Sequence, residues 1–166
     1  MAGRVIEIHP TARISSLADI EDSVRGSRIV VGANSVIDSF VKIKPAGGRG
    51  DLVVGSDSVI NSGCVLYTGN GLEIGDQVAI AANCAFAPTN HEFSSRSIPI
   101  RSQGFRPSKG GIKIGNDVWI GANCVFLDGS AVGQGCVIGA SSVVRGRLDP
   151  YGIYAGNPLV KIGERT

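Results

Sequence analysis

His91 carries the side chain best suited to proton transfer, and it is one of only two histidines in the chain. An imidazole, whose unperturbed pKa is about 6.5, can accept a proton at neutral pH and return it later. Proton transfer by such a base typically contributes about 10²- to 10⁴-fold to the rate of a reaction. The other histidine, His9, stands far away beside Pro10 and is interpreted as structural.

The elements that would hold His91 are predicted by a six-residue period in the aliphatic residues. A helix cannot follow this period, because six is a multiple of neither 3.6 nor 3.5. The pattern is typical of a β-solenoid with three short strands per coil, in which each aliphatic residue lies over its counterpart one coil below. At a strand spacing of roughly 4.8 Å, six coils would make a prism about 30 Å tall. The residues of the period are Ile8, Ile14, Ile20, Val31, Ile37, Ile43, Val54, Ile60, Leu66, Ile74, Ile80, Phe86, Ile114, Ile120, Phe126, Val132, Ile138 and Val144.

Counting the coils singles out one corner of this prism. Full coils of 18 residues span 8–25, 31–48, 54–71 and 74–91, and residues 114–149 make two more. The extra segments therefore all leave at the same corner, and they are 26–30, 49–53, 72–73 and 92–113. Insertions in solenoids collect on the binding face. His91 directly precedes the longest insertion and therefore lies at this corner, where either a functional or a solvated loop histidine fits the pattern.

The period ends after Val144, and the following segment is rich in proline and glycine. We interpret residues 150–166 as a terminal cap, because the end of a solenoid would otherwise offer an open edge for aggregation. The predicted fold is therefore all-β, with a single domain over residues 1–166. It contains hexapeptide coils over 8–149, an inserted loop over 92–113 and the cap.

Four cysteines could suggest a metal site or disulfides, but their places in the repeat favour a packing role. Each occupies the fifth position of a hexad, where other hexads have Ser or Val, and they are Cys64, Cys84, Cys124 and Cys136. We interpret them as small, reduced packing residues. No two are spaced as Cys-x-x-Cys, so we expect no metal site from these thiols.

Composition and charge exclude several other classes of protein. Hydrophobic residues make up 43% of the chain, enough for a real core, and the formal net charge is only +2. No block of basic residues indicates nucleic-acid binding. No apolar stretch approaches the roughly 20 residues of a membrane span, and residues 1–10 have no apolar core of the signal-peptide type. We therefore expect a cytoplasmic protein.

The repeat and the loop histidine occur together with two short sequence motifs, residues 114–121 (Ile-Gly-Asn-Asp-Val-Trp-Ile-Gly) and 155–158 (Ala-Gly-Asn-Pro). With these features, the chain resembles the left-handed β-helix, hexapeptide-repeat acyltransferases over about residues 31–158. Within them it is similar to the sugar and polysaccharide O-acetyltransferases, such as the galactoside and maltose acetyltransferases. The left-handed coil is implied by the resemblance alone, because right-handed crossovers are the general rule. The resemblance also implies a homotrimer with acetyl-CoA bound in grooves between adjacent subunits.

The position of His91 matches that of the catalytic histidine in this family. The implied reaction is direct transfer, in which His91 takes the proton from an acceptor hydroxyl and the oxygen attacks the thioester carbonyl, releasing CoA. A backbone N–H group is expected to hold the tetrahedral oxyanion. The implied acceptor is a sugar or glycan hydroxyl, with a role in building surface polysaccharide.

Three further residues are candidates for contact with the acceptor. Asn61 matches a position on the preceding coil from which sugar acetyltransferases contact the acceptor, although a turn asparagine that stabilises its own corner is the alternative. Asn83 could serve similarly. Glu92 could orient the imidazole, although a solvated glutamate is the alternative and the galactoside and maltose enzymes usually have a proline there. Where those enzymes tend to place an acidic acceptor contact, this chain has Gly69 and Asn70.

Trp119 and two turns of small residues are candidates for contact with the cofactor. Trp119, the only tryptophan, occupies an outward position and is expected to contact the cofactor or a neighbouring subunit, with packing by the long loop as the alternative. The resemblance implies that pantetheine passes the small-residue turns of the last coils, although the coil itself also requires small residues there. These turns are Gly121-Ala122 and Gly139-Ala140.

Cations are needed for the 3′-phosphate of CoA, and several basic residues are candidates. They are Arg145, Lys161 and Lys109, with Arg106, Arg147 and Arg165 as further possibilities. Relatives often have a basic residue two positions after the proline of Ala-Gly-Asn-Pro. Here Val160 stands at that position and Lys161 follows it.

Three alternatives bear on the function. An N-acetyltransferase acting on an amino sugar or nucleotide sugar is the first, although such enzymes often carry an N-terminal nucleotide-binding domain. The metal-bearing γ-type carbonic anhydrases use three histidines per site, which His91 and His9 cannot supply. A non-catalytic binding or structural solenoid would predict an unbroken prism without a cofactor, and the long insertion after His91 argues against it.

Overall fold

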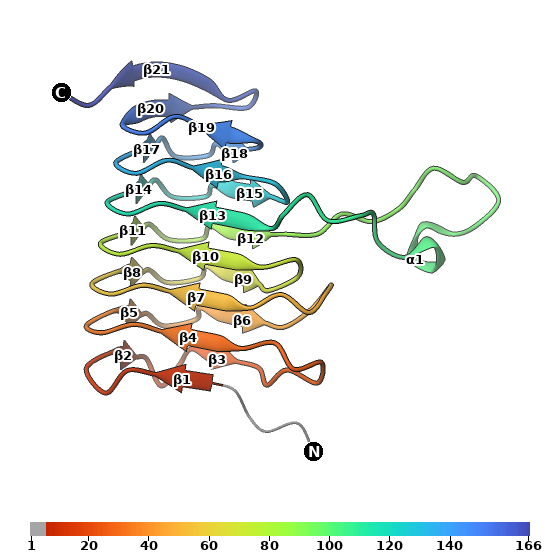
Figure 1. Ribbon diagram of the computed structural model, residues 1–166, viewed down its shortest axis with the longest axis horizontal. Helices are drawn as coiled ribbons and strands as arrows, with labels where there is room; N and C mark the ends of the chain where they lie inside the picture. The colour runs from red at the N-terminus through yellow and green to blue at the C-terminus, as the bar shows by residue number, and fades with distance from the viewer. Residues whose placement is uncertain (1–5) are drawn as a thin grey trace.

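The computed structural model describes residues 6–166 and shows a three-sided prism built from parallel sheets (Figure 1). Residues 1–5 lie outside the described residues. They are half of residues 1–10, the segment that we expect not to be a signal peptide. No helix among residues 6–166 is long and apolar enough to cross a membrane. The prism confirms the predicted all-β solenoid.

Each coil contributes one strand to each of three sheets, which we call A, B and C. Sheet A contains β1 (Ile6–Ile8), β4 (Ile29–Val31), β7 (Leu52–Val54), β10 (Leu72–Ile74), β13 (Ile112–Ile114), β16 (Ala131–Val132) and β19 (Arg147–Leu148). Sheet B contains β2 (Arg13–Ile14), β5 (Val36–Ile37), β8 (Val59–Ile60), β11 (Ala79–Ile80), β14 (Trp119–Ile120), β17 (Val137–Ile138), β20 (Gly152–Ala155) and β21 (Val160–Glu164). Sheet C contains β3 (Asp19–Ile20), β6 (Lys42–Lys44), β9 (Val65–Tyr67), β12 (Ala85–Ala87), β15 (Val125–Leu127) and β18 (Val143–Val144).

The hand of the coil can be followed in Figure 1. As the chain climbs from the N-terminus to the C-terminus, the strands of sheet A run leftward across the front and those of sheet C return rightward behind them. A coil with this sense is left-handed, as the resemblance implied. The chain turns from sheet A to B at what we call the first corner, from B to C at the second, and from C to A at the third.

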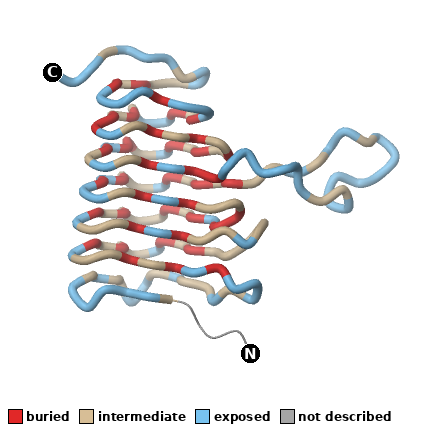
Figure 2. The backbone as a smooth tube through the Cα atoms, viewed as in Figure 1, coloured by how far each residue is buried: buried red, intermediate tan, exposed pale blue. Residues whose placement is uncertain are grey.

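The core consists of the aliphatic columns predicted from the six-residue period. The registers place Val54 beside Ile74 and Ile60 beside Ile80 in neighbouring coils. The rings of Phe86 and Phe126 stack with their centroids 4.8 Å apart. Every residue of the period from β4 onward is buried, and the buried positions line the inside of the prism (Figure 2). The first coil is partly exposed, because it forms the end of the prism.

The four cysteines pack inside the corners, which confirms their interpretation as small core residues. All four are free and buried. The thiol of Cys84 donates a hydrogen bond to the carbonyl oxygen of Gly121 in the next coil at 3.2 Å, and Cys64 bonds to Ala81 in the same way. At the first corner the hydroxyl of Ser58 makes the equivalent bond to Gly75 at 2.9 Å. A small donor at this position therefore satisfies a carbonyl of the coil above.

The longer connections all lie at the third corner, as the coil count predicted. The longest joins β12 to β13, and we call residues 88–111 the arm. The arm projects sideways from the prism and carries the short helix α1 (Ile100–Gln103) (Figure 1).

The carboxyl end of the prism continues into the segment expected to form the cap. β20 pairs in parallel with β17, so parallel stacking extends to Ala155. Only β21 turns back, and it pairs antiparallel with β20. This hairpin covers the end of sheet B, which leaves the edge of that sheet less open to pairing with another chain.

Candidate active site

His91 lies at the third corner, in the neck of the arm. The two legs of the neck pair as a short antiparallel ladder, with a bridge between His91 and Phe105. The N–H of Glu92 donates to the carbonyl oxygen of Gly104 at 3.0 Å, and the N–H of Arg106 donates to that of Asn90 at 2.8 Å. This ladder fixes the backbone of His91 opposite Phe105.

The imidazole of His91 is exposed and borders a small pocket. Its ring centroid lies 4.7 Å from that of Phe105, and the two planes are tilted by 37°. The pocket has a volume of about 230 Å³ and lies on the outer face of sheet C, toward the N-terminal coils. Its walls are Ala46, Gly47, Tyr67, Ala87, Thr89, His91 and Phe105. Two aromatic rings and several small residues thus surround a space for one ring-sized group beside a base.

Glu92 is bound to the backbone of the arm. One of its carboxylate oxygens accepts hydrogen bonds from the N–H groups of Phe93 at 2.8 Å and Ser94 at 2.9 Å. The bonds from Ser94, followed by that from Phe93 and by the nearby Arg106, lower the pKa of Glu92 to about 2. The guanidinium of Arg106 lies 3.5 Å from the same oxygen and 4.1 Å from the centroid of the Phe93 ring. Glu92 therefore shapes the turn that follows His91.

A second pocket, of about 330 Å³, lies on the C-terminal side of the arm. Three cations line it, namely Arg106 and Lys109 from the arm and Arg145 from the residues after β18. Arg145 also lines a third pocket of about 320 Å³, together with Asn157 and Pro158. Arg145 thus borders both pockets, and Lys and Arg are the side chains that bind phosphate groups. Both Lys109 and Arg145 were predicted from the sequence.

The sequence matches a transferase family model over part of its length and a probable acetyltransferase over almost all of it. A family model described as bacterial transferase hexapeptide (six repeats) matches residues 111–146. A probable acetyltransferase of Mycobacterium tuberculosis is 32% identical over 163 residues, which cover 98% of this chain and 49% of that protein. This chain therefore spans about half the length of that relative.

Solved structures agree with the sequence matches. A variant of AntD, an N-acyltransferase from Bacillus cereus, in complex with dTDP-4-amino-4,6-dideoxyglucose and coenzyme A, superimposes with a TM-score of 0.81 at 28% identity, covering 99% of this chain and 86% of that one. In sequence and in fold, the chain is similar to hexapeptide-repeat acyltransferases. A maltose O-acetyltransferase from Clostridium difficile 630 has a TM-score of 0.59 at 24% identity and covers 97% and 67% of the two chains, which shows the shared fold alone.

Several residues singled out by resemblance to these acyltransferases lie on another edge of the prism. The second corner carries Asn61, Asn83, Gly121, Ala122, Gly139 and Ala140. The side-chain amide of Asn61 donates to the carbonyl oxygen of Ile80 at 2.7 Å, so it ties its corner to the next coil. A Cβ atom on Gly121 would lie 2.5 Å from the backbone nitrogen of Ala140, which shows that the coil requires glycine there. One subunit does not bring this group to His91.

Trp119 and Lys161 both belong to sheet B. Trp119 is 57% exposed and stands in register with Ala79 below and Val137 above, which confirms its outward position. Lys161 lies on β21, where it forms an ion pair with Glu164. Within one subunit, neither side chain lines the pockets on either side of the arm.

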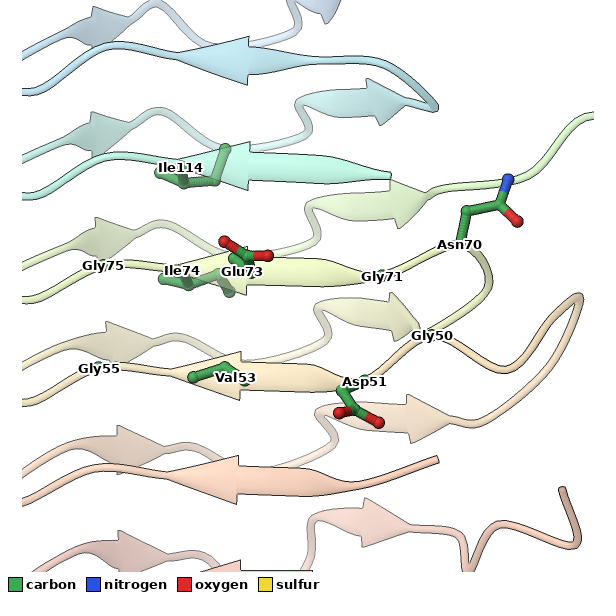
Figure 3. A pocket seen from close by; sticks show the side chains of 10 residues that line it. All are labelled: Gly50, Asp51, Val53, Gly55, Asn70, Gly71, Glu73, Ile74, Gly75 and Ile114. Atoms are coloured by element: carbon green, nitrogen blue, oxygen red, sulfur yellow. The ribbon is translucent and has the colours of Figure 1, made fainter. Parts of the chain in front are cut away.

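A pocket of about 570 Å³ lies on the outer face of sheet A, around the third corner from His91 (Figure 3). Asp51 and Glu73 project from it, and its remaining walls are mainly glycine backbone and aliphatic side chains. The negative charge of these carboxylates disfavours the phosphates of CoA. Among residues 6–166, no cluster of three or more His, Cys, Asp or Glu side chains is arranged to hold a metal ion.

Sequence reasoning missed Tyr67, Phe105 and Asp128. Tyr67 follows the hexad residue Leu66 and points outward, so the period itself could have placed it on the face of sheet C. Phe105 meets His91 only through pairing within the arm, for which the sequence has no periodic signal. Asp128 is buried at the third corner, and its only signal in the sequence is an acidic residue before Gly129 where the chain passes from one coil to the next.

Proposed function

We propose that this acyltransferase moves the acetyl group of acetyl-CoA to a hydroxyl group of a sugar or glycan, with His91 as the general base. The observation that carries the proposal is the position of His91 in the neck of the arm. On one side lies a ring-sized pocket with aromatic walls, and on the other a cationic pocket. A base between a site for an acceptor ring and a site for phosphates is the arrangement that acyl transfer from a CoA thioester needs.

The cationic pocket is the proposed site of acetyl-CoA. Arg106, Lys109 and Arg145 face the same space and would attract the phosphates of CoA. From there the pantetheine chain would run toward the neck and bring the thioester beside His91. AntD, which shares the fold at 28% identity, has been solved with 3-hydroxybutyryl-CoA, which supports an acyl-CoA donor in this family.

The aromatic pocket is the proposed site of the acceptor ring. Tyr67 and Phe105 present exposed ring surface to it, and the apolar face of a pyranose can pack against such rings. Ala46 and Ala87 leave room that larger side chains would fill. The complex of AntD with a nucleotide-linked amino sugar supports a sugar as the acceptor class.

The proposed reaction is a direct transfer in which His91 accepts the proton of the acceptor hydroxyl. The oxygen attacks the thioester carbonyl carbon and forms a tetrahedral intermediate. The C–S bond then breaks, and the proton returns from the imidazolium to the thiolate of CoA. Proton transfer by a positioned base typically contributes about 10²- to 10⁴-fold.

We further propose that the protein is a cytoplasmic homotrimer with its sites between subunits, acting in polysaccharide biosynthesis. His91 and the cationic pocket lie at the third corner, whereas Gly121, Gly139 and Trp119 lie along sheet B and the second corner. If both groups contact the same CoA molecule, they must come from different subunits. A ring of prisms in which the third corner of one meets the second corner of the next satisfies this condition.

A second candidate function is N-acylation of an amino sugar linked to a nucleotide. The similarity to AntD, an N-acyltransferase solved with dTDP-4-amino-4,6-dideoxyglucose, favours it. An amine can attack as the neutral base, so this reaction depends less on a general base than attack by a hydroxyl does.

The test is release of CoA thiol from acetyl-CoA in the presence of matched acceptors. Each sugar would be supplied in a hydroxyl form and in an amino form, free and linked to a nucleotide, and the product would be identified by mass spectrometry. The proposal expects transfer to hydroxyl oxygen. Transfer to the amino acceptors alone would establish the second function, and no turnover together with no CoA binding at millimolar concentration would favour a non-catalytic solenoid.

A further inference from the structure

Asp128 is a buried carboxylate at the third corner, directly after β15. Its residue is only 6% exposed, and it lies one coil above the point where the arm leaves the prism. Burying a carboxylate is costly unless hydrogen bonds compensate the charge. The groups that donate hydrogen bonds to Asp128 therefore identify the segments of the chain that its side chain holds in place.

All three donors to Asp128 belong to the root of the arm or to the turn beneath it. One carboxylate oxygen accepts the N–H of Gly111 at 2.9 Å. The other accepts the N–H of Lys109 at 2.8 Å and the side-chain amide of Asn70 at 3.2 Å. Hydrogen bonds to a charged acceptor are roughly twice as strong as neutral ones. Asp128 therefore fastens the returning leg of the arm to the coil above.

Asn70 connects this cluster to the outgoing leg. Its backbone N–H donates to the carbonyl oxygen of Pro88, the first residue of the arm, at 3.2 Å. In Figure 3 its side chain points from the turn between β9 and β10 toward the coil above. One residue thus touches the outgoing leg through its backbone and the returning leg through Asp128.

Gly111 allows the returning leg of the arm to pack closely against the turn between β9 and β10. Its φ of +76° favours glycine, and a Cβ atom there would lie 2.4 Å from the carbonyl oxygen of Gly71. Its own carbonyl oxygen accepts the N–H of Gly129 at 2.7 Å. The returning leg is therefore held both by the side chain of Asp128 and by the backbone of the following residue.

We propose that Asp128 is a positioning residue of the acyl-transfer site. Through Lys109, Gly111 and Asn70 it keeps the two legs of the neck in register, so that His91 stays against Phe105 and Lys109 stays on the wall of the cationic pocket. The kinetic part of this inference rests on the proposed function, whereas the structural part does not.

The kinetic test compares Asp128→Asn with Asp51→Asn. Asp51 is a matched control, because at the same corner it accepts one backbone N–H, that of Arg28 at 2.7 Å, without touching the arm. In Asp128→Asn, an NH₂ group replaces one of the two carboxylate oxygens that accept backbone N–H groups of the arm. Because an NH₂ group cannot accept a hydrogen bond, at least one bond to the arm is lost. A small misplacement of reacting groups can cost up to about 10²-fold, so we expect kcat to fall roughly tenfold and the KM for acetyl-CoA to rise roughly tenfold. Asn70→Ala should act in the same direction with a smaller effect.

A second readout does not depend on turnover. The chain has only two histidines, so ¹³C-labelled histidine gives two imidazole signals, which His9→Gln assigns. The ring of Phe105 should shift the His91 signal, and this shift should be lost or the signal broadened in Asp128→Asn but kept in Asp51→Asn. If wild-type protein transferred no acetyl group to any acceptor, the proposed function would fail while this spectrum would still decide the role of Asp128.

Circular dichroism and thermal unfolding establish that each variant is folded. A folded Asp128→Asn protein with wild-type kcat, wild-type KM and an unchanged His91 signal would overturn the proposal. If Asp128→Asn did not fold, Asn70→Ala would decide in its place, because Asn70 is only partly buried and its side chain serves the same cluster. An unchanged His91 signal in that variant would equally overturn the proposal.

Discussion

At the residue scale, His91 takes its setting from groups on both legs of the arm. Phe105 limits where the imidazole can lie, and Glu92 fixes the turn that follows it. Glu92 is adjacent to His91 in sequence, yet its carboxylate bonds to the backbone of Phe93 and Ser94. Glu92 therefore supports His91 by fixing the conformation of the arm.

The lowered pKa of Glu92 gives a prediction for the behaviour of the arm in acid. Because its pKa in the folded protein is about 2, below the ordinary value of 4.5, Glu92 contributes its stabilisation fully above about pH 4.5 and loses it as the pH falls toward about 2. The amide resonance of Ser94 should stay constant from pH 7 to about 4.5 and should change only as the pH approaches about 2. Glu92→Gln should abolish this titration. A midpoint at the ordinary value for glutamate would show that the carboxylate is free.

At the element scale, the strands could be predicted from the sequence and the neck of the arm could not. The columns of Val54, Ile74 and Ile114 repeat a local period, and stacking one coil on the next is the direct way to bury them. The third corner also followed from counting residues. The pairing of His91 with Phe105 depends instead on how an irregular segment folds back on itself, which leaves no period in the sequence.

The same limit applies to the candidate site. Lys109 and Arg145 could be predicted from the need for cations, and the structure places both on one pocket. The apolar side of the site was missed, because Tyr67 and Ala87 look like ordinary outward residues of strands until the arm closes over them. Side chains that act only through a long insertion are visible only in three dimensions.

Filling the aromatic pocket tests the assignment of the acceptor site. Ala87→Leu, on the outer face of β12, should raise the KM for the sugar roughly tenfold because the larger side chain occupies the pocket, while the KM for acetyl-CoA stays unchanged. Ala85→Leu is the matched control on the same strand, where Val65 and Val125 occupy the neighbouring coils. Equal KM values for the two variants would place the acceptor elsewhere.

At the scale of the whole molecule, the residues implied by the family resemblance divide between two edges of one prism. The third corner supplies His91 and the cations, and the second corner supplies turns without bulky side chains. The six-residue period could have placed the two sets at different corners, because Gly121 follows the second hexad residue of its coil and His91 ends a third hexad. The structure shows that a single subunit keeps them apart. The proposed trimer is the arrangement that would reunite them.

Mixed trimers test this division. Ala140→Trp should block the second corner, since Ala140 is exposed there, and His91→Ala should remove the base, so each variant alone should be inactive. Random assembly of the two chains in equal amounts should recover activity at about a quarter of all sites, where an intact second corner meets an intact His91. The two variants mixed without exchange of subunits serve as the control. Co-assembled protein that is no more active than this control would contradict a site shared between subunits.

The central claim is that His91 is the base in transfer to a hydroxyl group, and the most direct test is thiol release from acetyl-CoA by His91→Ala. With a hydroxyl acceptor, kcat/KM should fall at least about a hundredfold, because the proton of the attacking oxygen has no acceptor in the neck. His9→Gln, which alters the other histidine in the first coil, should keep wild-type activity. Full activity in a folded His91→Ala protein would contradict the account.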